Sequence, residues 1–439
     1  MTFEEAKAYI ENHSFSKWKL GLTRARILLE MLGNPQNKLR FVHVAGSNGK
    51  GSTCAMLERI LREAGYTTGF FPSPYIEDFR ERFQICGTYI SEEDLAAITE
   101  TVRDAADRME DHPTQFELIC AIGMVYFARM QCDIVVLEVG LGGEYDATNV
   151  IRAPEVAVIA RIGLEHTEYL GDTLAKIART KSGIIKKGCD VVCLEAEEEA
   201  RREVLAKAQE EGCTFTQAEP GRVDLLTSTL AGQSFFWMQP QDQGQEREDT
   251  SYLLPDRLPV TLSLAGAYQL QNVSTVLTTA EVLRRRGFAI TPSHVQQALK
   301  DVSWPARFEV LKLDPPFILD GGHNPQCAQA LAESVARFLP GQRVLFLMGV
   351  LSDKKYDRMI DALRPYAARF LCVTPDSSRA LSAAQLADIL QKKGLEAAPY
   401  TRIEDAVQNA LAGSLPVVAF GSLYMAGRIR AAVRNATRD

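Results

Sequence analysis

The chain has 439 residues, of which 46% are hydrophobic and 24% are charged, an ordinary composition for a globular protein of more than one domain. Its formal net charge of -7 argues against a broad nucleic-acid-binding surface, which needs a basic face. The acidic, amphipathic N-terminal segment is unlike a secretory signal, and no stretch reaches the roughly 18 consecutive apolar residues of a membrane span. We therefore expect a cytoplasmic protein that binds neither nucleic acid nor membranes.

A glycine-rich turn near the N-terminus is the first strong functional signal. Residues 41–45 predict a buried strand and residues 53–64 predict a helix, with Gly49, Lys50, Gly51 and Ser52 before that helix. Glycines let backbone amides approach an anion at the positive end of a helix, and a lysine there can neutralise a polyphosphate. The pattern departs by one position from the general phosphate loop, because Gly51 precedes the hydroxyl. A plain glycine turn with a solvated lysine is the alternative.

Strands and helices alternate over most of the first 300 residues. The expected strands cover residues 41–45, 67–71, 133–139, 155–160 and 190–194. This alternation predicts a parallel sheet covered by helices on both faces. Short β-like runs interrupt it over 221–263, where 239–250 has the composition of an exposed loop. A helix over 268–286 then closes the first domain.

Trp304-Pro305 marks the expected domain boundary, which gives domains at 1–303 and 304–439. Beyond it, strands near Phe317, Val344, Phe370 and Val417 alternate with helices over 327–338, 356–367 and 381–392. About 130 residues is a usual size for one domain. The second domain is therefore expected to be a smaller α/β domain.

Four polar side chains follow predicted strands of the first domain. Ser52, Ser73, Glu138 and His166 lie at or just after strand ends, and ligands of open parallel sheets collect at the carboxyl ends of strands. Magnesium prefers oxygen ligands, which suits the two serines and Glu138 better than His166. Each residue has a structural alternative when it is taken alone, such as a buried hydrogen-bonded carboxylate for Glu138.

Signals farther along the chain are weaker by themselves. Lys181 is best explained as a solvated cation at a helix carboxyl terminus. The turn LDGGHNP carries Asp320 and His323, Arg307 precedes it, and GSLY follows an apolar strand; all three are compatible with ordinary turns or surface charge. The residues alone predict an enzyme that uses a nucleoside triphosphate with magnesium, and they do not name the reaction.

Six segments together resemble one protein family. They are GSNGKGS, SPYIEDFRER, FELICAIGMVYF, EVGLGGEYDATNV, IGLEHTEYLGDTLAKIARTKSGIIK and LDGGHNP. In this order they resemble the folylpolyglutamate synthase and dihydrofolate synthase branch of the Mur ligase superfamily. The resemblance implies a Mur-ligase-like α/β fold, with a P-loop parallel-sheet ATPase domain and then a smaller Rossmann-like glutamate ligase domain. It also implies ATP-dependent addition of L-glutamate to a folate γ-carboxylate or to dihydropteroate through an acyl phosphate.

The resemblance assigns roles to single residues. The residues implied to bind ATP are Gly49, Lys50, Gly51, Ser52, Asn272, Arg307 and Asp320. Ser73, Glu138 and His166 are the implied magnesium ligands for up to two ions. Lys181 matches the carbamylated lysine of the family, which would make it an anion that helps to hold the second ion. Lys50, Lys181 and His323 are the implied catalytic residues.

The implied folate and glutamate contacts lie on both domains. On the folate side they are Phe116, Glu117, Tyr145, Asp146, Ala147 and the GLTRAR segment; His323, Ser422 and Tyr424 are assigned to glutamate and catalytic support. The resemblance also implies a monomer. Tyr75, where many relatives have His, and Glu144-Tyr145, where Arg-Leu is commoner, depart from the family pattern and leave the substrate preference open.

Three other functions remain as alternatives. The nearest is a Mur-type or other amino-acid ligase that acts on a non-folate carboxylate. A GTPase-like switch is disfavoured because the sequence has no N-K-x-D guanine motif. A nucleotide-binding scaffold without turnover would release no ADP with any acceptor.

Overall fold

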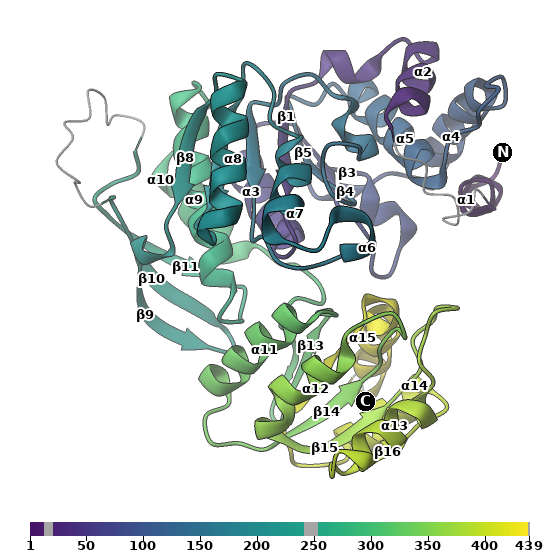
Figure 1. Ribbon diagram of the computed structural model, residues 1–439, viewed down its shortest axis with the longest axis vertical. Coiled ribbons are helices and arrows are strands. Elements are labelled where there is room, and N and C mark those ends of the chain that lie inside the picture. The colour runs from purple at the N-terminus through teal and green to yellow at the C-terminus, as the bar shows by residue number, and fades with distance from the viewer. Residues whose placement is uncertain (13–20, 241–252, 438–439) are drawn as a thin grey trace. The chain divides into compact units, whose positions relative to one another are not determined.

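The computed structural model describes residues 1–12, 21–240 and 253–437 (Figure 1). Contacts divide the chain into two compact units. Unit 1 comprises Met1–Asp224, Phe236–Val260 and Gln271–Lys300; unit 2 comprises Leu225–Phe235, Thr261–Leu270 and Asp301–Asp439. The helix break expected near 13–19 and most of the loop expected over 239–250 lie outside the described residues. No helix among the described residues is long and apolar enough to cross a membrane.

Unit 1 is organised around an eight-stranded sheet of order β4-β3-β2-β5-β1-β6-β7-β8. Its strands are β1 (Phe41–Ala45), β2 (Thr68–Phe71), β3 (Gln84–Ile85), β4 (Thr88–Tyr89), β5 (Ile134–Glu138), β6 (Val156–Ile159), β7 (Asp190–Leu194) and β8 (Thr214–Ala218). The strands from β2 to β8 in this order are parallel, and β3 and β4 extend one edge in antiparallel fashion. Strand β1 lies between β5 and β6 and is fully buried. The loop after β1 therefore lies at the point where the strand order of the sheet reverses. Ligands of open α/β sheets usually bind at such a point.

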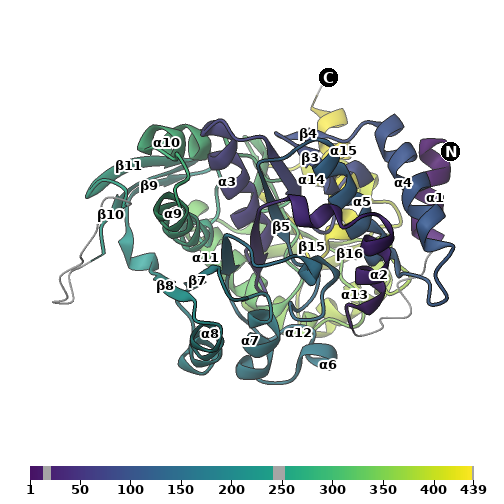
Figure 2. The ribbon, with the colours of Figure 1, turned by 90° about the horizontal axis from the view of Figure 1, so that it is seen from above.

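Helices cover both faces of this sheet, as the alternation predicts. Figure 2 shows α7 and α8 on one face and α9 on the other. The helices up to residue 301 are α1 (Phe3–Asn12), α2 (Thr23–Met31), α3 (Lys50–Glu63), α4 (Glu92–Ala106), α5 (Gln115–Arg129), α6 (Thr167–Leu170), α7 (Leu174–Ser182), α8 (Glu198–Glu210), α9 (Gln269–Arg285) and α10 (Pro292–Asp301). Thr114 caps α5 with a capping box, because its hydroxyl accepts from Glu117 N–H while the Glu117 carboxylate accepts from Thr114 N–H.

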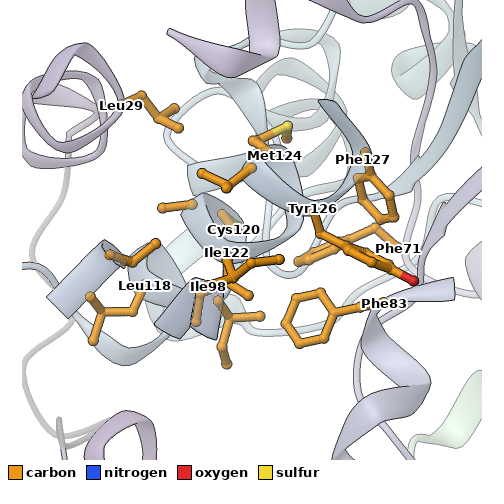
Figure 3. Close-up of a cluster of buried hydrophobic side chains, with 14 of the residues drawn as sticks. Leu29, Phe71, Phe83, Ile98, Leu118, Cys120, Ile122, Met124, Tyr126 and Phe127 are labelled. Atoms are coloured by element: carbon orange, nitrogen blue, oxygen red, sulfur yellow. The ribbon is translucent and has the colours of Figure 1, made fainter. Parts of the chain in front are cut away.

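A large apolar cluster of unit 1 lies between β2, β5 and the helices α1, α2, α4 and α5. Figure 3 shows its aromatic part, in which the rings of Phe71 and Phe83 meet edge to face at 5.9 Å between centroids. Helix α5 is almost wholly buried, with only its first and last turns partly exposed. This packing fixes the start of α5, which carries two of the predicted folate contacts.

A three-stranded sheet of order β11-β10-β9 follows, formed by β9 (Val223–Thr229), β10 (Gly232–Met238) and β11 (Arg257–Leu262). The division into units passes through each of these strands. The short β-like runs expected over 221–263 are therefore real strands.

Unit 2 contains a six-stranded sheet of order β12-β13-β17-β14-β15-β16. Its strands are β12 (Glu309–Leu313), β13 (Pro316–Asp320), β14 (Val344–Met348), β15 (Ala367–Cys372), β16 (Ala397–Pro399) and β17 (Val417–Phe420); its helices are α11 (Pro325–Phe338), α12 (Tyr356–Leu363), α13 (Ala383–Lys392), α14 (Ile403–Leu411) and α15 (Ala426–Ala436). All neighbours are parallel except β12 and β13. Helices α11, α12 and α13 share one apolar cluster with alternate strand residues, as expected for a sheet with helices on it.

Most helix limits differ from the predicted ones by one or two residues, and two helices differ more. Helix α3 begins at Lys50 rather than at residue 53, because Gly49 adopts a positive φ of 83° and serves as its N-cap. The helix expected over 356–367 ends at Leu363 and tightens into a 3-10 turn at Arg364–Tyr366, where Pro365 cannot continue it.

Candidate active site

The turn between β1 and α3 is held by hydrogen bonds to the segment that follows β6 (Val156–Ile159). Ser47 N–H donates to Arg161 O at 2.7 Å, and Ser47 Oγ donates to Gly163 O at 2.8 Å and accepts from Gly163 N–H at 2.9 Å. A side chain is excluded at Gly49, because a Cβ there would lie 2.3 Å from Asn272 Oδ1 on α9. The structure thus places Asn272 directly beside the phosphate loop within unit 1.

Two lysines meet at one carbonyl of this loop. Lys50 Nζ and Lys181 Nζ each donate to Gly46 O at 2.9 Å. Lys181 also pairs with Glu165 Oε1 at 2.8 Å and is only 1% exposed. Burial lowers the pKa of Lys181, although the charge of Glu165 opposes the shift. Lys181 is therefore not the solvated cation of the simplest sequence interpretation but a buried one aimed at the loop.

Ser73 and Glu138 are neighbours at the ends of adjacent strands β2 and β5. The Ser73 N–H donates to Glu138 Oε2 at 3.0 Å, and Ser73 Oγ accepts from Arg82 Nη1 at 3.3 Å. Glu138 is 4% exposed, and register places it opposite Val44 of β1. Glu138 thus lies on β5, directly beside β1, the strand that leads into the phosphate loop.

His166 and Ser52 complete the predicted metal and phosphate residues. His166 has a positive φ of 45° and precedes α6. Burial raises the pKa of Glu165, but the neighbouring charges, those of Lys181 and Lys50 ahead of that of His166, lower it below its usual value. Ser52 is 2% exposed on the first turn of α3. Among the described residues, no three His, Cys, Asp or Glu side chains are grouped as a metal site; the predicted set relies on Ser73 and Lys181 in addition to Glu138 and His166.

The predicted residues of unit 2 gather at the carboxyl ends of neighbouring strands β13 and β17. Asp320 ends β13 opposite Phe420, and Gly421 N–H donates to Gly322 O at 3.0 Å. His323 Nδ1 lies 3.1 Å from Gly321 O. Ser422 is buried and caps a short 3-10 turn, whereas Tyr424 is 52% exposed.

Some of the predicted folate contacts are exposed, and others are buried in contact with the rest of the protein. Tyr145 is 47% exposed, and the Phe116 ring packs so close to Gly140 that a Cβ there would lie 2.6 Å from it. Asp146 is buried, and its carboxylate accepts from Leu141 N–H at 2.8 Å and Thr148 N–H at 3.0 Å. Ala147, 7% exposed, follows it. Asp146 therefore holds the loop after β5 in shape.

The carboxylate of Glu117 is also bound by another side chain of the protein. Arg24 Nε and Nη2 each donate to its carboxylate at 3.0 Å, and both side chains are buried. Arg24 also borders a cavity of about 540 Å³ beside α2, which Gly21 and Thr23 of the GLTRAR segment line with it. The predicted folate segment thus adjoins a cavity, and Glu117 holds the Arg24 side chain of that segment in place.

Comparison with known proteins identifies the family. The Mur ligase middle domain matches residues 44–280, and the Mur ligase glutamate ligase domain matches residues 306–422. The folylpolyglutamate synthase of Lacticaseibacillus casei is 34% identical over 98% of this chain and 98% of its own length. The dihydrofolate synthase/folylpolyglutamate synthase of Bacillus subtilis (strain 168) is 33% identical with the same two coverages. The chain belongs to the folylpolyglutamate synthase and dihydrofolate synthase family.

A solved structure of this family has the same fold. E. coli FolC in complex with DHPP and ADP aligns with a TM-score of 0.83 and 27% identity, over 100% of this chain and 99% of that chain. The resemblance predicted from the motifs is confirmed, as is the α/β fold with a P-loop parallel-sheet domain and a second, smaller α/β domain. The predicted enzyme class is also confirmed: the chain is an ATP-dependent ligase of the folylpolyglutamate synthase and dihydrofolate synthase family. The roles of single residues stay predictions.

Sequence reasoning missed several residues of this family member's site. Glu165 pairs with Lys181, Arg82 donates to Ser73, and Tyr268 donates to Asp320 at 2.6 Å. Glu165 had a readable signal, because it follows β6 in the same polar segment as His166. The partners of Arg82 and Tyr268 lie 9 and 52 positions away, and no local pattern identifies them.

Proposed function

We propose that this protein uses ATP to join L-glutamate through an amide bond to the γ-carboxylate of a folate, and that dihydropteroate is its other acceptor. The observation that carries the proposal is the meeting of Lys50 and Lys181 at Gly46 O, beside Asn272 and on the same sheet edge as Ser73 and Glu138. This arrangement suits a triphosphate whose terminal phosphoryl group is transferred to a carboxylate.

The first step makes an acyl phosphate. A carboxylate oxygen of the acceptor attacks the γ-phosphorus of ATP, the bond to the β,γ-bridging oxygen breaks, and ADP leaves. Lys50 and the amides of Gly49, Gly51 and Ser52 stabilise the charge on the phosphoryl oxygens. Lys50 is already aimed at the loop, because its ammonium is held by Gly46 O.

The second step forms the amide. The free amine of glutamate attacks the acyl carbon, the bond to the phosphate oxygen breaks, and inorganic phosphate leaves with the proton that the amine loses. His323, Ser422 and Tyr424 are the proposed contacts for glutamate, and Arg307 and Asp320 belong to the nucleotide side of the same unit. Asp320, His323, Ser422 and Tyr424 lie at or just after the ends of β13 and β17, which supports this assignment. Arg307 precedes β12, and its neighbour Ala306 accepts from Gly321 N–H beside them.

Magnesium is the proposed metal, with two ions. The oxygens of Ser73 and Glu138 fit it, since they are hard donors placed side by side by the Ser73 N–H. Bound there with His166, the ions would neutralise phosphate charge during transfer. We propose that Lys181 reacts with carbon dioxide to give a carbamate and a proton; burial favours the neutral amine that this reaction needs, and the Glu165 pair must be released.

The acceptor is proposed to lie near Phe116, Tyr145 and Ala147, with Glu117 and Asp146 behind them. Tyr145 replaces the commoner leucine and is half exposed, so it is the residue through which this chain would differ in acceptor preference. The family resemblance supports a monomer.

The test is an ADP-release assay with ATP, magnesium and glutamate, run in parallel with tetrahydrofolate and with dihydropteroate. We expect ADP formation that depends on glutamate and on the pterin. ADP release only with a non-folate acid, or none with either pterin, would refute the proposal. The Lys50→Ala variant serves as the control, because it removes the cation of the loop.

A further inference from the structure

The backbone around Arg307 is unusual. Ala306 has a φ of 54° and Phe308 a φ of 50°, so two residues with side chains adopt the left-handed region on either side of one arginine. Such residues cost free energy and persist only where surrounding contacts over-determine them, commonly at functional sites. Ala306 and Phe308 are buried, and Arg307 between them is only partly buried.

Three contacts over-determine this segment within unit 2. Phe308 N–H donates to Asp320 Oδ2 at 3.0 Å, Gly321 N–H donates to Ala306 O at 2.8 Å, and Ala306 N–H donates to Glu309 Oε2 at 2.8 Å. Glu309 is in turn held by Arg430 Nε at 3.0 Å. Within the described residues of its own unit, Arg307 makes no hydrogen bond or ion pair through its side chain. The segment therefore fixes the backbone of Arg307 and leaves its guanidinium available.

Tyr268 completes this arrangement. Its hydroxyl donates to Asp320 Oδ2 at 2.6 Å, the same oxygen that receives Phe308 N–H, while Asp320 Oδ1 accepts from Gly322 N–H at 2.7 Å. Gly266 allows the close approach, because a Cβ there would lie 3.0 Å from Phe308 Cβ and 3.3 Å from Tyr268 Cε1. Burial and the charge of Asp320 raise the pKa of Tyr268 well above its usual value, and Arg307 acts against that rise. The tyrosine thus remains a hydrogen-bond donor beside a nearby guanidinium.

We propose that Tyr268 is a positioning residue for ATP use: its hydroxyl fixes Asp320, and Asp320 holds the left-handed segment that presents Arg307. In this account Asp320, which is 4% exposed and receives three donors, acts mainly through Arg307. The inference rests on the proposed contact between Arg307 and the nucleotide.

A double-mutant cycle tests it, with the affinity for a non-hydrolysable ATP analogue as the first readout and kcat/KM for ATP as the second. Tyr268→Phe keeps the ring and removes one hydrogen bond to a charged group, so both values should fall by about tenfold. In an Arg307→Ala background the same change should alter them by less than about twofold, because the two residues act as one. The KM for glutamate should not change.

Tyr366→Phe is the matched control. Tyr366 is partly buried and packs, like Tyr268, against the apolar cluster of unit 2. Its variant should retain the wild-type affinity for the analogue and the wild-type kcat/KM for ATP. Glu309→Ala, on a partly exposed side chain that holds Ala306, is the second variant and should show the same dependence on Arg307. Thermal unfolding of each variant checks that it is folded.

Wild-type affinity in Tyr268→Phe, or an equal loss with and without Arg307, would overturn the inference. Wild-type affinity in Arg307→Ala would overturn it as well. Because analogue binding is measured without ligation, a protein that binds the analogue but joins glutamate to neither pterin would refute the proposed function and leave this cycle valid.

Discussion

Two arginine–glutamate pairs of equal geometry allow the structural role of Glu117 to be measured. Arg24 donates from Nε and Nη2 to Glu117 at 3.0 Å each, and Arg179 donates from the same atoms to Glu203 at 2.9 and 3.1 Å. The side chains of the first pair are 9% and 6% exposed, and those of the second are 74% and 24% exposed. The pairs differ in burial, and the buried pair has two further contacts: Glu117 accepts from Thr114 N–H at 2.7 Å, and Arg24 Nη1 lies 3.4 Å from Asp111 Oδ2.

Glu117→Gln should therefore destabilise the protein much more than Glu203→Gln. Removing the charge of Glu117 leaves the buried Arg24 with the more exposed Asp111, 3.4 Å away, as its charged partner, and breaking a buried pair in this way costs about 3 kcal/mol. For a unit of this size that corresponds to a fall in the melting temperature of roughly 5 °C. Exposed pairs contribute little because water screens them.

Thermal unfolding followed by circular dichroism measures both variants, and the KM for the pterin is measured beside it. We expect a large fall in melting temperature for Glu117→Gln only. If instead Glu117→Gln unfolds like the wild type and only the KM for the pterin rises, Glu117 contacts substrate directly and the reasoning from burial is wrong.

Three further predictions concern other parts of unit 1. Gly49→Ala should weaken binding of an ATP analogue by at least about tenfold, since a Cβ at φ 83° would collide with Asn272; calorimetry checks this, and unchanged affinity would contradict the loop geometry. Burial lowers the pKa of Lys186 to about 8 from 10.5, so between these values the unfolded chain binds a proton that the folded one has lost, and stability should rise with pH. Lys186→Met should lose that rise in urea titrations from pH 8 to 10, and a parallel rise in both proteins would argue against it. Cys189 Sγ and Cys213 Sγ lie 3.7 Å apart, and each cysteine comes directly before a strand, at Asp190 and Thr214, which pair with each other. A disulfide reagent should therefore oxidise the two thiols to one disulfide. Mass spectrometry should show the loss of two hydrogens in the wild type and in Cys193→Ser but not in Cys213→Ser.

The phosphate loop and the sheet were predictable because their causes are local. An apolar run, three glycines and a lysine within a few positions determine the strand and the turn, and alternation determines the parallel sheet. The start of α3 was predicted three residues late, because the positive φ of Gly49 places Lys50 in the first turn.

The partners of the site residues were not predictable in the same way. Lys181 was expected to be solvated by its place near a helix end, yet the fold buries it against Glu165 and Gly46 O. The left-handed Ala306 and Phe308 have no sequence signal, because neither residue type favours that region. Their conformation depends on Asp320 and Glu309, contacts that only the folded chain creates.

The central claim is that ATP activates a pterin carboxylate for attack by glutamate. The most direct measurement incubates the protein with ATP, magnesium, glutamate and dihydropteroate labelled with oxygen-18 in its carboxylate, and then weighs the pterin product and the phosphate. The account predicts a pterin heavier by one glutamyl residue and inorganic phosphate that carries one labelled oxygen. A glutamyl product with unlabelled phosphate, or ADP release without any glutamyl product, would contradict it.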